Sequence, residues 1–305
     1  MLKPEGIIPA MVTPFTSSEE VNEPVLRQLV KRYVDAGVHG LFCLGTNGEF
    51  FSLTFDEKIR IAEIIIDEVK GKVPVYVGAG CITTSETVRM AKKLEEIGAD
   101  ALSVITPYFL TFTQDELVEH FKRIADSTRL PVVLYNIPSR TGNSLLPGSV
   151  GVLSQIPNIV GIKDSSGSFD NTLQYLDAVG PEFSVLAGTD SLILPTLMAG
   201  GKGAIAATAN ILPETVVSIY THWQAGRFAE AEEGQKQLRA IRSAMGLGTL
   251  PTVLKEAMNI MGLPVGPARA PVAALPEAKY NQLMKVMDAY IQKGVIQASN
   301  GSAMV

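Results

Sequence analysis

Eight short apolar segments, rich in β-branched and aromatic residues, alternate along most of the chain with longer amphipathic segments. The segments between them, such as DEKIRIAEIIIDEV from Asp56, have the apolar spacing of helices. The eight apolar segments are GIIPAMV from Gly6, VHGLFCL from Val38, VPVYVGA from Val73, ALSVI from Ala101, LPVVLYN from Leu130, IVGIK from Ile159, FSVLA from Phe183 and GAIAA from Gly203. Strands that are apolar on both faces fit a parallel sheet buried between helices and a packed interior. Eight such units in about 225 residues predict an α/β fold of the (β/α)8 TIM-barrel type, and a doubly wound sheet is the alternative.

Helix signals without strands fill the rest of the chain. Three amphipathic segments follow residue 226, namely RFAEAEEGQKQLRAIRSAM, PTVLKEAMNIMG and PEAKYNQLMKVMDAYIQKG. We therefore predict a catalytic barrel over residues 1–226 and a C-terminal helical domain over residues 227–305. Because no Ser/Gly-rich linker separates them, we expect the helical domain to pack on the barrel. We expect the last residues, ASNGSAMV, to be frayed.

Charge, termini and cysteines exclude several classes of function. With 305 residues and a formal net charge of -5, the chain has no basic surface for a nucleic acid or an anionic membrane. The N-terminal MLKPEGIIPAMVTPF has no signal-peptide core, and no segment is long enough to span a bilayer, so we expect a cytoplasmic protein. Cys43 and Cys81 lie in apolar runs, where we expect buried reduced thiols. The three histidines are isolated, so no metal site is expected.

In a (β/α)8 barrel the functional residues lie where the strands end at their carboxyl side. The segment IVGIK ends on Lys163, at the mouth of an apolar interior. An ammonium group is poorly solvated there, which favours the neutral amine, and a neutral amine can attack a ketone to form a protonated Schiff base. The alternative is a lysine on the rim of the barrel that forms an ion pair with Asp164.

Two other strand ends carry polar residues that suit the same chemistry. Tyr135 can carry a proton to and from the carbinolamine and pass it to Thr46, or it can be a core tyrosine. The turn containing Thr46 and Asn47 presents backbone N–H groups suited to a carboxylate, although ordinary turns have the same composition. Arg140 is either a fork for a second carboxylate or a surface guanidinium with an acidic neighbour.

Two carboxylates near these positions are expected to be structural. Asp190 is expected to be the N-cap of the segment SLILPTLMAG, and Glu49 to brace its turn from inside the protein. The turn lacks the Gly-Lys-Ser/Thr ending of a P-loop and the glycine spacing of a dinucleotide-binding motif, so nucleotide binding is disfavoured.

Four motifs in a fixed order are more specific than any one of these residues. They are GTNGE from Gly45, YNIPSRTG from Tyr135, GIKDSSG from Gly161 and GPARAP from Gly266. Over nearly its whole length the chain resembles the dihydrodipicolinate synthase and N-acetylneuraminate lyase family of class I, pyruvate-dependent aldolases. The resemblance implies a barrel with a C-terminal helical domain, no cofactor beyond a lysine Schiff base with pyruvate, and a homotetramer built as a dimer of dimers.

The resemblance also implies roles for individual residues. Lys163 is then the Schiff-base residue, Tyr135 the proton carrier, and Thr46 with Asn47 the turn that binds the pyruvate carboxylate. Arg140 lies where the synthase binds the carboxylate of its aldehyde substrate. The backbone of two further residues is expected to complete the floor of the pocket, namely Gly188 and Ile205.

Departures from the synthase pattern favour a different reaction. The segment TPYFLTF places Phe109 where dihydrodipicolinate synthases carry a tyrosine that reaches into the neighbouring subunit's site, and phenylalanine cannot carry a proton. Asn47 replaces a threonine, and FFSLTF replaces the histidines of lysine-regulated synthases, so regulation by lysine is not expected.

We therefore predict a lyase that cleaves a 4-hydroxy-2-oxo acid to pyruvate and an aldehyde. Its substrate would be 4-hydroxy-2-oxoglutarate or a 2-keto-3-deoxy sugar acid. One alternative is the 4-hydroxy-tetrahydrodipicolinate synthase of lysine biosynthesis, because the intact YNIPSRTG keeps its arginine. A dehydratase of a deoxy-keto sugar acid and a non-catalytic keto-acid-binding homologue are further alternatives; Phe109 motivates the last.

Overall fold

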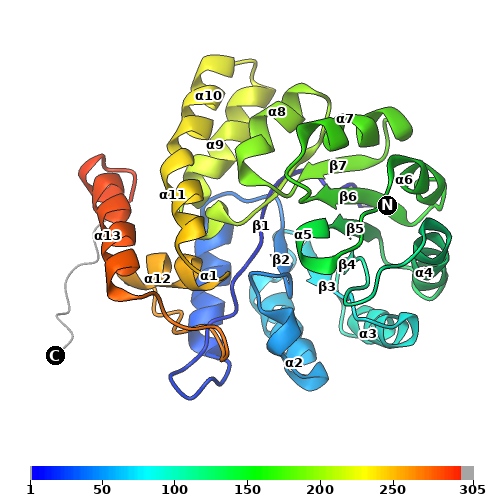
Figure 1. The fold of residues 1–305 in the computed structure, drawn as a ribbon, viewed down its shortest axis with the longest axis horizontal. Helices are drawn as coiled ribbons and strands as arrows, with labels where there is room; N and C mark the ends of the chain where they lie inside the picture. The colour runs from blue at the N-terminus through cyan, green and yellow to red at the C-terminus, as the bar shows by residue number, and fades with distance from the viewer. Residues whose placement is uncertain (1, 297–305) are drawn as a thin grey trace.

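The computed structural model describes residues 2–296, in which eight parallel strands form a barrel surrounded by helices (Figure 1). The strands are β1 (Gly6–Pro9), β2 (Leu41–Cys43), β3 (Val75–Gly78), β4 (Ala101–Ile105), β5 (Val132–Asn136), β6 (Ile159–Asp164), β7 (Ser184–Ala187) and β8 (Gly203–Ala206). Their order is β1-β8-β7-β6-β5-β4-β3-β2, and a parallel bridge from Ala10 to Phe42 joins the two ends. Each predicted strand is present, which confirms the (β/α)8 barrel and makes the doubly wound alternative wrong.

Helices pack around the outside of the barrel, and local sequence signals set where several of them begin. Helix α2 follows Thr54, whose hydroxyl accepts a hydrogen bond from the N–H of Glu57 while the Glu57 carboxylate accepts one from the N–H of Thr54. The outer helices are α1 (Glu23–Asp35), α2 (Phe55–Val69), α3 (Thr84–Glu96), α4 (Gln114–Asp126), α5 (Pro138–Thr141), α6 (Pro147–Leu153), α7 (Phe169–Ala178), α8 (Ile193–Met198) and α9 (Pro213–Gln224).

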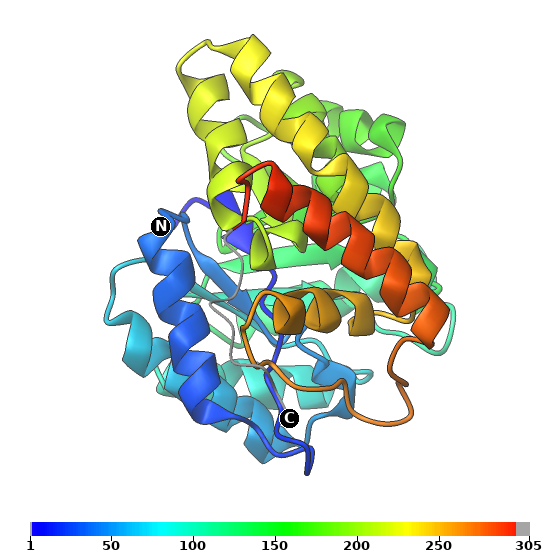
Figure 2. The same ribbon diagram turned by 90° about the vertical axis from the view of Figure 1, so that its left-hand side faces the viewer.

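The C-terminal part of the described chain is helical and lies along one side of the barrel (Figure 2). Its helices are α10 (Phe228–Gln237), α11 (Arg239–Ala244), α12 (Thr252–Ile260) and α13 (Glu277–Gln292). The first predicted helix is divided at Leu238 between α10 and α11. The predicted boundary at residue 226 falls between α9 and α10, and the division into two domains stays a prediction. The last predicted residues, ASNGSAMV, lie outside the described range.

The C-terminal helices approach the carboxyl ends of the strands. Helix α11 contacts a short 3₁₀ helix, η2 (Asp190–Leu192), that follows β7, and α12 contacts a second one, η3 (Thr208–Asn210), that follows β8. Since the carboxyl ends of the strands form the functional face of this fold, residues of α11 are in position to contribute to a site there.

Candidate active site

Lys163 and Asp164 are adjacent on β6, so their side chains point to opposite faces of the strand. The Lys163 side chain points into the barrel, where only 4% of it is exposed and Nζ lies 4.1 Å from the ring centre of Tyr135. The Asp164 carboxylate faces outward and accepts hydrogen bonds of 3.0 Å from the side chain of Thr172 and the N–H of Ser166. The alternative in which Lys163 pairs with Asp164 is therefore wrong.

Tyr135 is the direct neighbour of Lys163 on the adjacent strand, β5. It is buried, and its ring meets Phe42 edge to face at a centroid distance of 6.3 Å. The Tyr135 hydroxyl lies 3.4 Å from Oγ1 of Thr46, in the turn that follows β2. The lysine, phenol and threonine hydroxyl therefore lie along one wall of the barrel mouth, in the order that proton transfer to and from a carbinolamine would need.

The turn from Gly45 to Glu49 is fixed from several directions. The Asn47 amide donates to the backbone carbonyl of Ala10, and the Thr13 hydroxyl donates to that of Gly48. Within residues 2–296 no hydrogen bond engages the backbone N–H groups of Thr46 and Asn47. These two donors are available to an anion, which suits a carboxylate better than it suits a neutral ligand.

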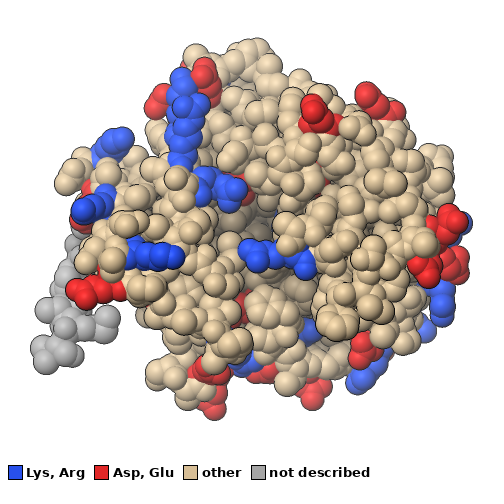
Figure 3. Space-filling view, viewed as in Figure 1, with Lys and Arg blue, Asp and Glu red and all other residues tan. Residues whose placement is uncertain are grey.

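All seven predicted site residues line one cavity of about 230 Å³ at the carboxyl ends of the strands. Figure 3 shows this face, which is hollowed near its centre, with Lys and Arg side chains close to the hollow. A Cβ on Gly188 would lie 2.9 Å from the backbone carbonyl oxygen of Asp164, so glycine is needed where β7 ends. The residues are Thr46, Asn47, Tyr135, Arg140, Lys163, Gly188 and Ile205, and their catalytic and binding roles stay predictions.

The structure excludes an acidic partner for Arg140 within residues 2–296 and a helix-capping role for Asp190. Arg140, on α5, is exposed at the cavity, and within the described residues no carboxylate forms an ion pair with it, unlike the surface pair considered above. The prediction that Asp190 caps its own helix is wrong. Its carboxylate accepts hydrogen bonds from the N–H groups of Ala207 and Thr208, and so ties the end of β7 to the segment after β8.

Glu49 is buried, as expected, but its main partners lie more than 200 residues away in the chain. Its carboxylate is 0% exposed, lies 2.7 Å from Nζ of Lys255 on α12, and accepts a 2.9 Å hydrogen bond from the N–H of Arg269. Burial lowers the pKa of Lys255 to about 8, and the charge of Glu49 opposes this shift. The turn from Gly45 to Glu49 is thus anchored to the C-terminal helical part.

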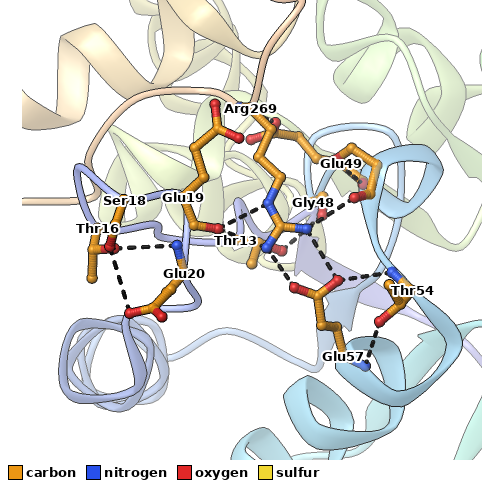
Figure 4. Close-up of polar contacts among 11 residues, drawn as sticks. Thr13, Thr16, Ser18, Glu19, Glu20, Gly48, Glu49, Thr54, Glu57 and Arg269 are labelled. Carbon is orange, nitrogen blue, oxygen red and sulfur yellow. Dashed lines mark hydrogen bonds and ion pairs between the residues drawn. The ribbon is translucent and has the colours of Figure 1, made fainter.

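A second set of polar contacts, made by Arg269, lies beside Glu49 (Figure 4). The Arg269 guanidinium, from the GPARAP motif, donates to both carboxylate oxygens of Glu57 and to the backbone carbonyls of Glu19 and Ser52. Arg269 holds the pKa of Glu57 down, at about 2. Bidentate pairing of this kind fixes geometry as well as charge, so three separate segments are held together beside the turn.

Residues without a predicted role also line the cavity. Arg242 on α11 and Leu250, between α11 and α12, come from the C-terminal helical part, and Ser165 and Thr189 follow β6 and β7. The two serine and threonine positions could have been found as strand-end polar residues. Arg242 lies in an ordinary amphipathic segment, where no local signal distinguishes it.

The remaining sequence predictions concern thiols, metals and membranes. Cys43 is buried, and burial raises its thiol pKa to about 12, whereas Cys81 is only half-buried in the loop after β3, contrary to expectation. Among residues 2–296, no cluster of three or more His, Cys, Asp or Glu side chains is arranged to hold a metal ion. Within the same residues, no helix is both long and apolar enough to cross a bilayer.

A buried lysine beside a phenol, at the carboxyl end of a barrel strand and close to free backbone donors, is the arrangement of a class I aldolase. Comparison with known proteins gives the particular family. The chain belongs to the dihydrodipicolinate synthetase family, whose model matches residues 3–290. It is therefore an enzyme of the class I aldolase type, and the alternative of a non-catalytic binding protein loses its support.

Similar proteins cover almost the whole chain. A 4-hydroxy-tetrahydrodipicolinate synthase of Methanopyrus kandleri is 40% identical over 270 residues, 88% of this chain and 90% of the relative. An uncharacterised DapA-like lyase of Halobacterium salinarum is 38% identical over 272 residues, 89% of each chain. The crystal structure of the Escherichia coli prophage protein YagE in complex with pyruvate superposes with a TM-score of 0.90 at 35% identity, over 93% of this chain and 98% of YagE.

Proposed function

We propose that this enzyme is a 4-hydroxy-tetrahydrodipicolinate synthase that condenses pyruvate with aspartate semialdehyde through an imine on Lys163. The observation that carries the proposal is the Lys163 amine, buried beside the Tyr135 phenol in a cavity that also presents the unpaired guanidinium of Arg140. The lyase favoured by the sequence takes second place, because relatives such as the Methanopyrus kandleri protein carry the name of the synthase.

The proposed reaction needs no cofactor beyond this imine. The Lys163 amine attacks the ketone carbon of pyruvate, and the carbinolamine loses water to give the imine. Loss of a methyl proton gives an enamine, whose carbon adds to the aldehyde of the second substrate. The amino group of that substrate then displaces Lys163 from the imine carbon and closes the ring. The N–H groups of Thr46 and Asn47 hold the pyruvate carboxylate, while Gly188 and Ile205 form the pocket floor.

Proton transfer is assigned to the pair formed by Tyr135 and Thr46. Tyr135→Phe removes the hydroxyl that lies 3.4 Å from Oγ1 of Thr46, on the ring that contacts Nζ of Lys163, so kcat/KM should fall about 10²- to 10⁴-fold, the usual contribution of a positioned acid–base group. Steady-state kinetics with pyruvate and the aldehyde measures the loss. Tyr108→Phe is the matched control, since Tyr108 does not line this cavity, and it should retain wild-type rates. A Tyr135→Phe enzyme with unchanged kcat would remove the phenol from the mechanism.

The second candidate, cleavage of a 4-hydroxy-2-oxo acid, rests on Phe109. This side chain is 90% exposed and has no hydroxyl to give to a relay. A substrate panel separates the two: the synthase predicts that aspartate semialdehyde with pyruvate gives the highest kcat/KM, whereas the lyase predicts 4-hydroxy-2-oxoglutarate or 2-keto-3-deoxygluconate. If the synthase is limited by the missing phenol, Phe109→Tyr should raise its rate. An unchanged rate in that variant would show that the phenol does not limit this enzyme.

We further propose that the chain assembles as a homotetramer, a dimer of dimers, as its family resemblance implies. Phe109 has a backbone φ of +84°, which is costly for a non-glycine residue and needs surrounding structure to hold it. Its neighbour Leu110 and the side chains of Phe51 and Ile82 are exposed apolar residues as well. A second copy packed over this surface would bury these side chains. A cytoplasmic location stays a prediction.

A further inference from the structure

We propose that Arg242 is a specificity-determining residue that binds an anionic group on the second substrate, together with Arg140, so that the aldehyde accepted by this site is itself an acid. This inference rests on the proposed function and deepens it, because it adds a residue that recognises the acidic group of the second substrate. It concerns a residue of the C-terminal helical part, whereas the imine chemistry belongs to the barrel.

The position of Arg242 brings it to the cavity from outside the barrel. Helix α11 contacts the segment after β7, and Arg242 lines the same cavity as Lys163 and Arg140. Leu250 is the other lining residue from beyond the barrel strands and their helices. Arg140 comes from α5, after β5, so the two guanidinium groups reach one cavity from different parts of the chain.

The charge of the cavity is unbalanced. Arg140, Lys163 and Arg242 line it with a single carboxylate, that of Asp190. The Asp190 carboxylate is already engaged by two backbone N–H groups, and no ion pair within the described residues includes it. An arginine keeps its charge under all physiological conditions, so a ligand without negative charge would leave two guanidinium groups uncompensated in this cavity.

The Arg242 side chain also has an unsatisfied hydrogen-bond donor. Its Nε is buried and has no hydrogen-bond partner among the described residues. A buried donor left without a partner destabilises the protein that contains it. No ion pair or side-chain hydrogen bond within residues 2–296 holds this guanidinium, so it is available to a ligand oxygen in the cavity. Arginine forks match the planar geometry of a carboxylate, with two parallel N–H···O hydrogen bonds.

The two ends of the site then select different groups. The pyruvate carboxylate is assigned to the N–H groups of Thr46 and Asn47, which leaves the two arginines for the other reactant. We infer a short aldehyde that bears a carboxylate, such as aspartate semialdehyde or glyoxylate. Glyceraldehyde, the neutral fragment of a 2-keto-3-deoxy sugar acid, would leave Arg242 without a partner.

The test compares acidic and neutral aldehydes in one variant. Arg242→Gln should lower kcat/KM about ten- to a hundredfold for aspartate semialdehyde and glyoxylate, mainly through KM, because it removes a charged hydrogen bond to the substrate. The low rate with glyceraldehyde and the KM for pyruvate should stay at wild-type values. Arg242→Lys, which keeps the charge without the fork, should give intermediate losses. Arg239→Gln is the matched control, since Arg239 is exposed on the same helix and lines a neighbouring cavity of about 380 Å³, which Arg242 also borders, but does not line the cavity that contains Lys163.

The outcomes distinguish this inference from the proposed function. Equal losses with acidic and neutral aldehydes, no loss with acidic ones, or a wild-type preference for glyceraldehyde would each overturn the role of Arg242. If circular dichroism shows that Arg242→Gln is unfolded, the Arg242→Lys variant decides by the same comparison. Borohydride trapping of pyruvate on Lys163, followed by peptide mass measurement, tests the imine separately. Absence of the adduct in the wild type would overturn the proposed function itself.

Discussion

Replacing Lys163 with arginine should lower turnover about 10⁴-fold or more, the scale of loss when a covalent nucleophile is removed. The guanidinium stays protonated and cannot attack the pyruvate ketone. It also keeps a positive charge beside the rings of Tyr135 and Phe42, which lie 4.1 and 5.0 Å from Nζ in the native protein. The fold should therefore survive while the chemistry is lost. Steady-state kinetics and borohydride trapping with pyruvate measure the two consequences together.

A matched control separates the chemistry from the effect of a larger side chain. Lys202→Arg makes the same substitution just before β8, at the amino end of the barrel strands, and should retain wild-type kinetics. Circular dichroism of both variants should match the native spectrum. Retained turnover, or a reduced adduct on some other lysine, would mean that the imine forms elsewhere.

Replacing Lys255 with methionine should lower the free energy of unfolding by about 3 to 5 kcal/mol, the usual loss when one partner of a buried ion pair is removed. Methionine fills similar space, but it leaves the carboxylate of Glu49 buried at 0% exposure without its cation. It also removes the 2.7 Å hydrogen bond from Nζ to the carbonyl of Pro267. Urea unfolding followed by circular dichroism measures the change.

The double variant Lys255→Met with Glu49→Gln provides the decisive comparison. Because the buried charge is gone, most of the lost stability should return, and the two changes should be far from additive. If the single Lys255→Met variant loses less than about 1 kcal/mol, the pair is not a significant support for the fold. Since Glu49 ends the turn that contains Thr46 and Asn47, a raised KM for pyruvate in Lys255→Met would show that the pair also positions that turn.

Local periodicity was sufficient to predict the barrel and the strand ends. Each strand is an apolar run bounded by turn residues, and the alternation of side chains along β6 places Lys163 inside once its neighbours are known to be buried. The capping box of Thr54 and Glu57 also follows from local sequence, because both partners lie within one turn of helix. At α3 the box is incomplete, since the Glu86 carboxylate bonds to the Thr83 hydroxyl instead of the backbone.

Long-range contacts account for what the sequence did not predict. The partners of Glu49 and Asp190 lie in other segments of the chain, so a single sequence offers no signal that joins them. The pairing of Lys163 with Asp164 was a reasonable local alternative, and it fails only because adjacent strand residues face opposite sides. Arg242 reaches the cavity because α11 packs against the barrel. No motif in α11 itself predicts this position.

The location of Arg242 outside the barrel has an evolutionary consequence. With the role proposed for Arg242, a mutation in α11 would change which aldehyde is accepted and leave Lys163, Tyr135 and the turn with Thr46 untouched, since none of these residues lies on that helix. Selection can then act separately on the choice of aldehyde and on the formation of the carbon–carbon bond. An enzyme with this architecture can thus acquire a new aldehyde substrate through substitutions in one six-residue helix.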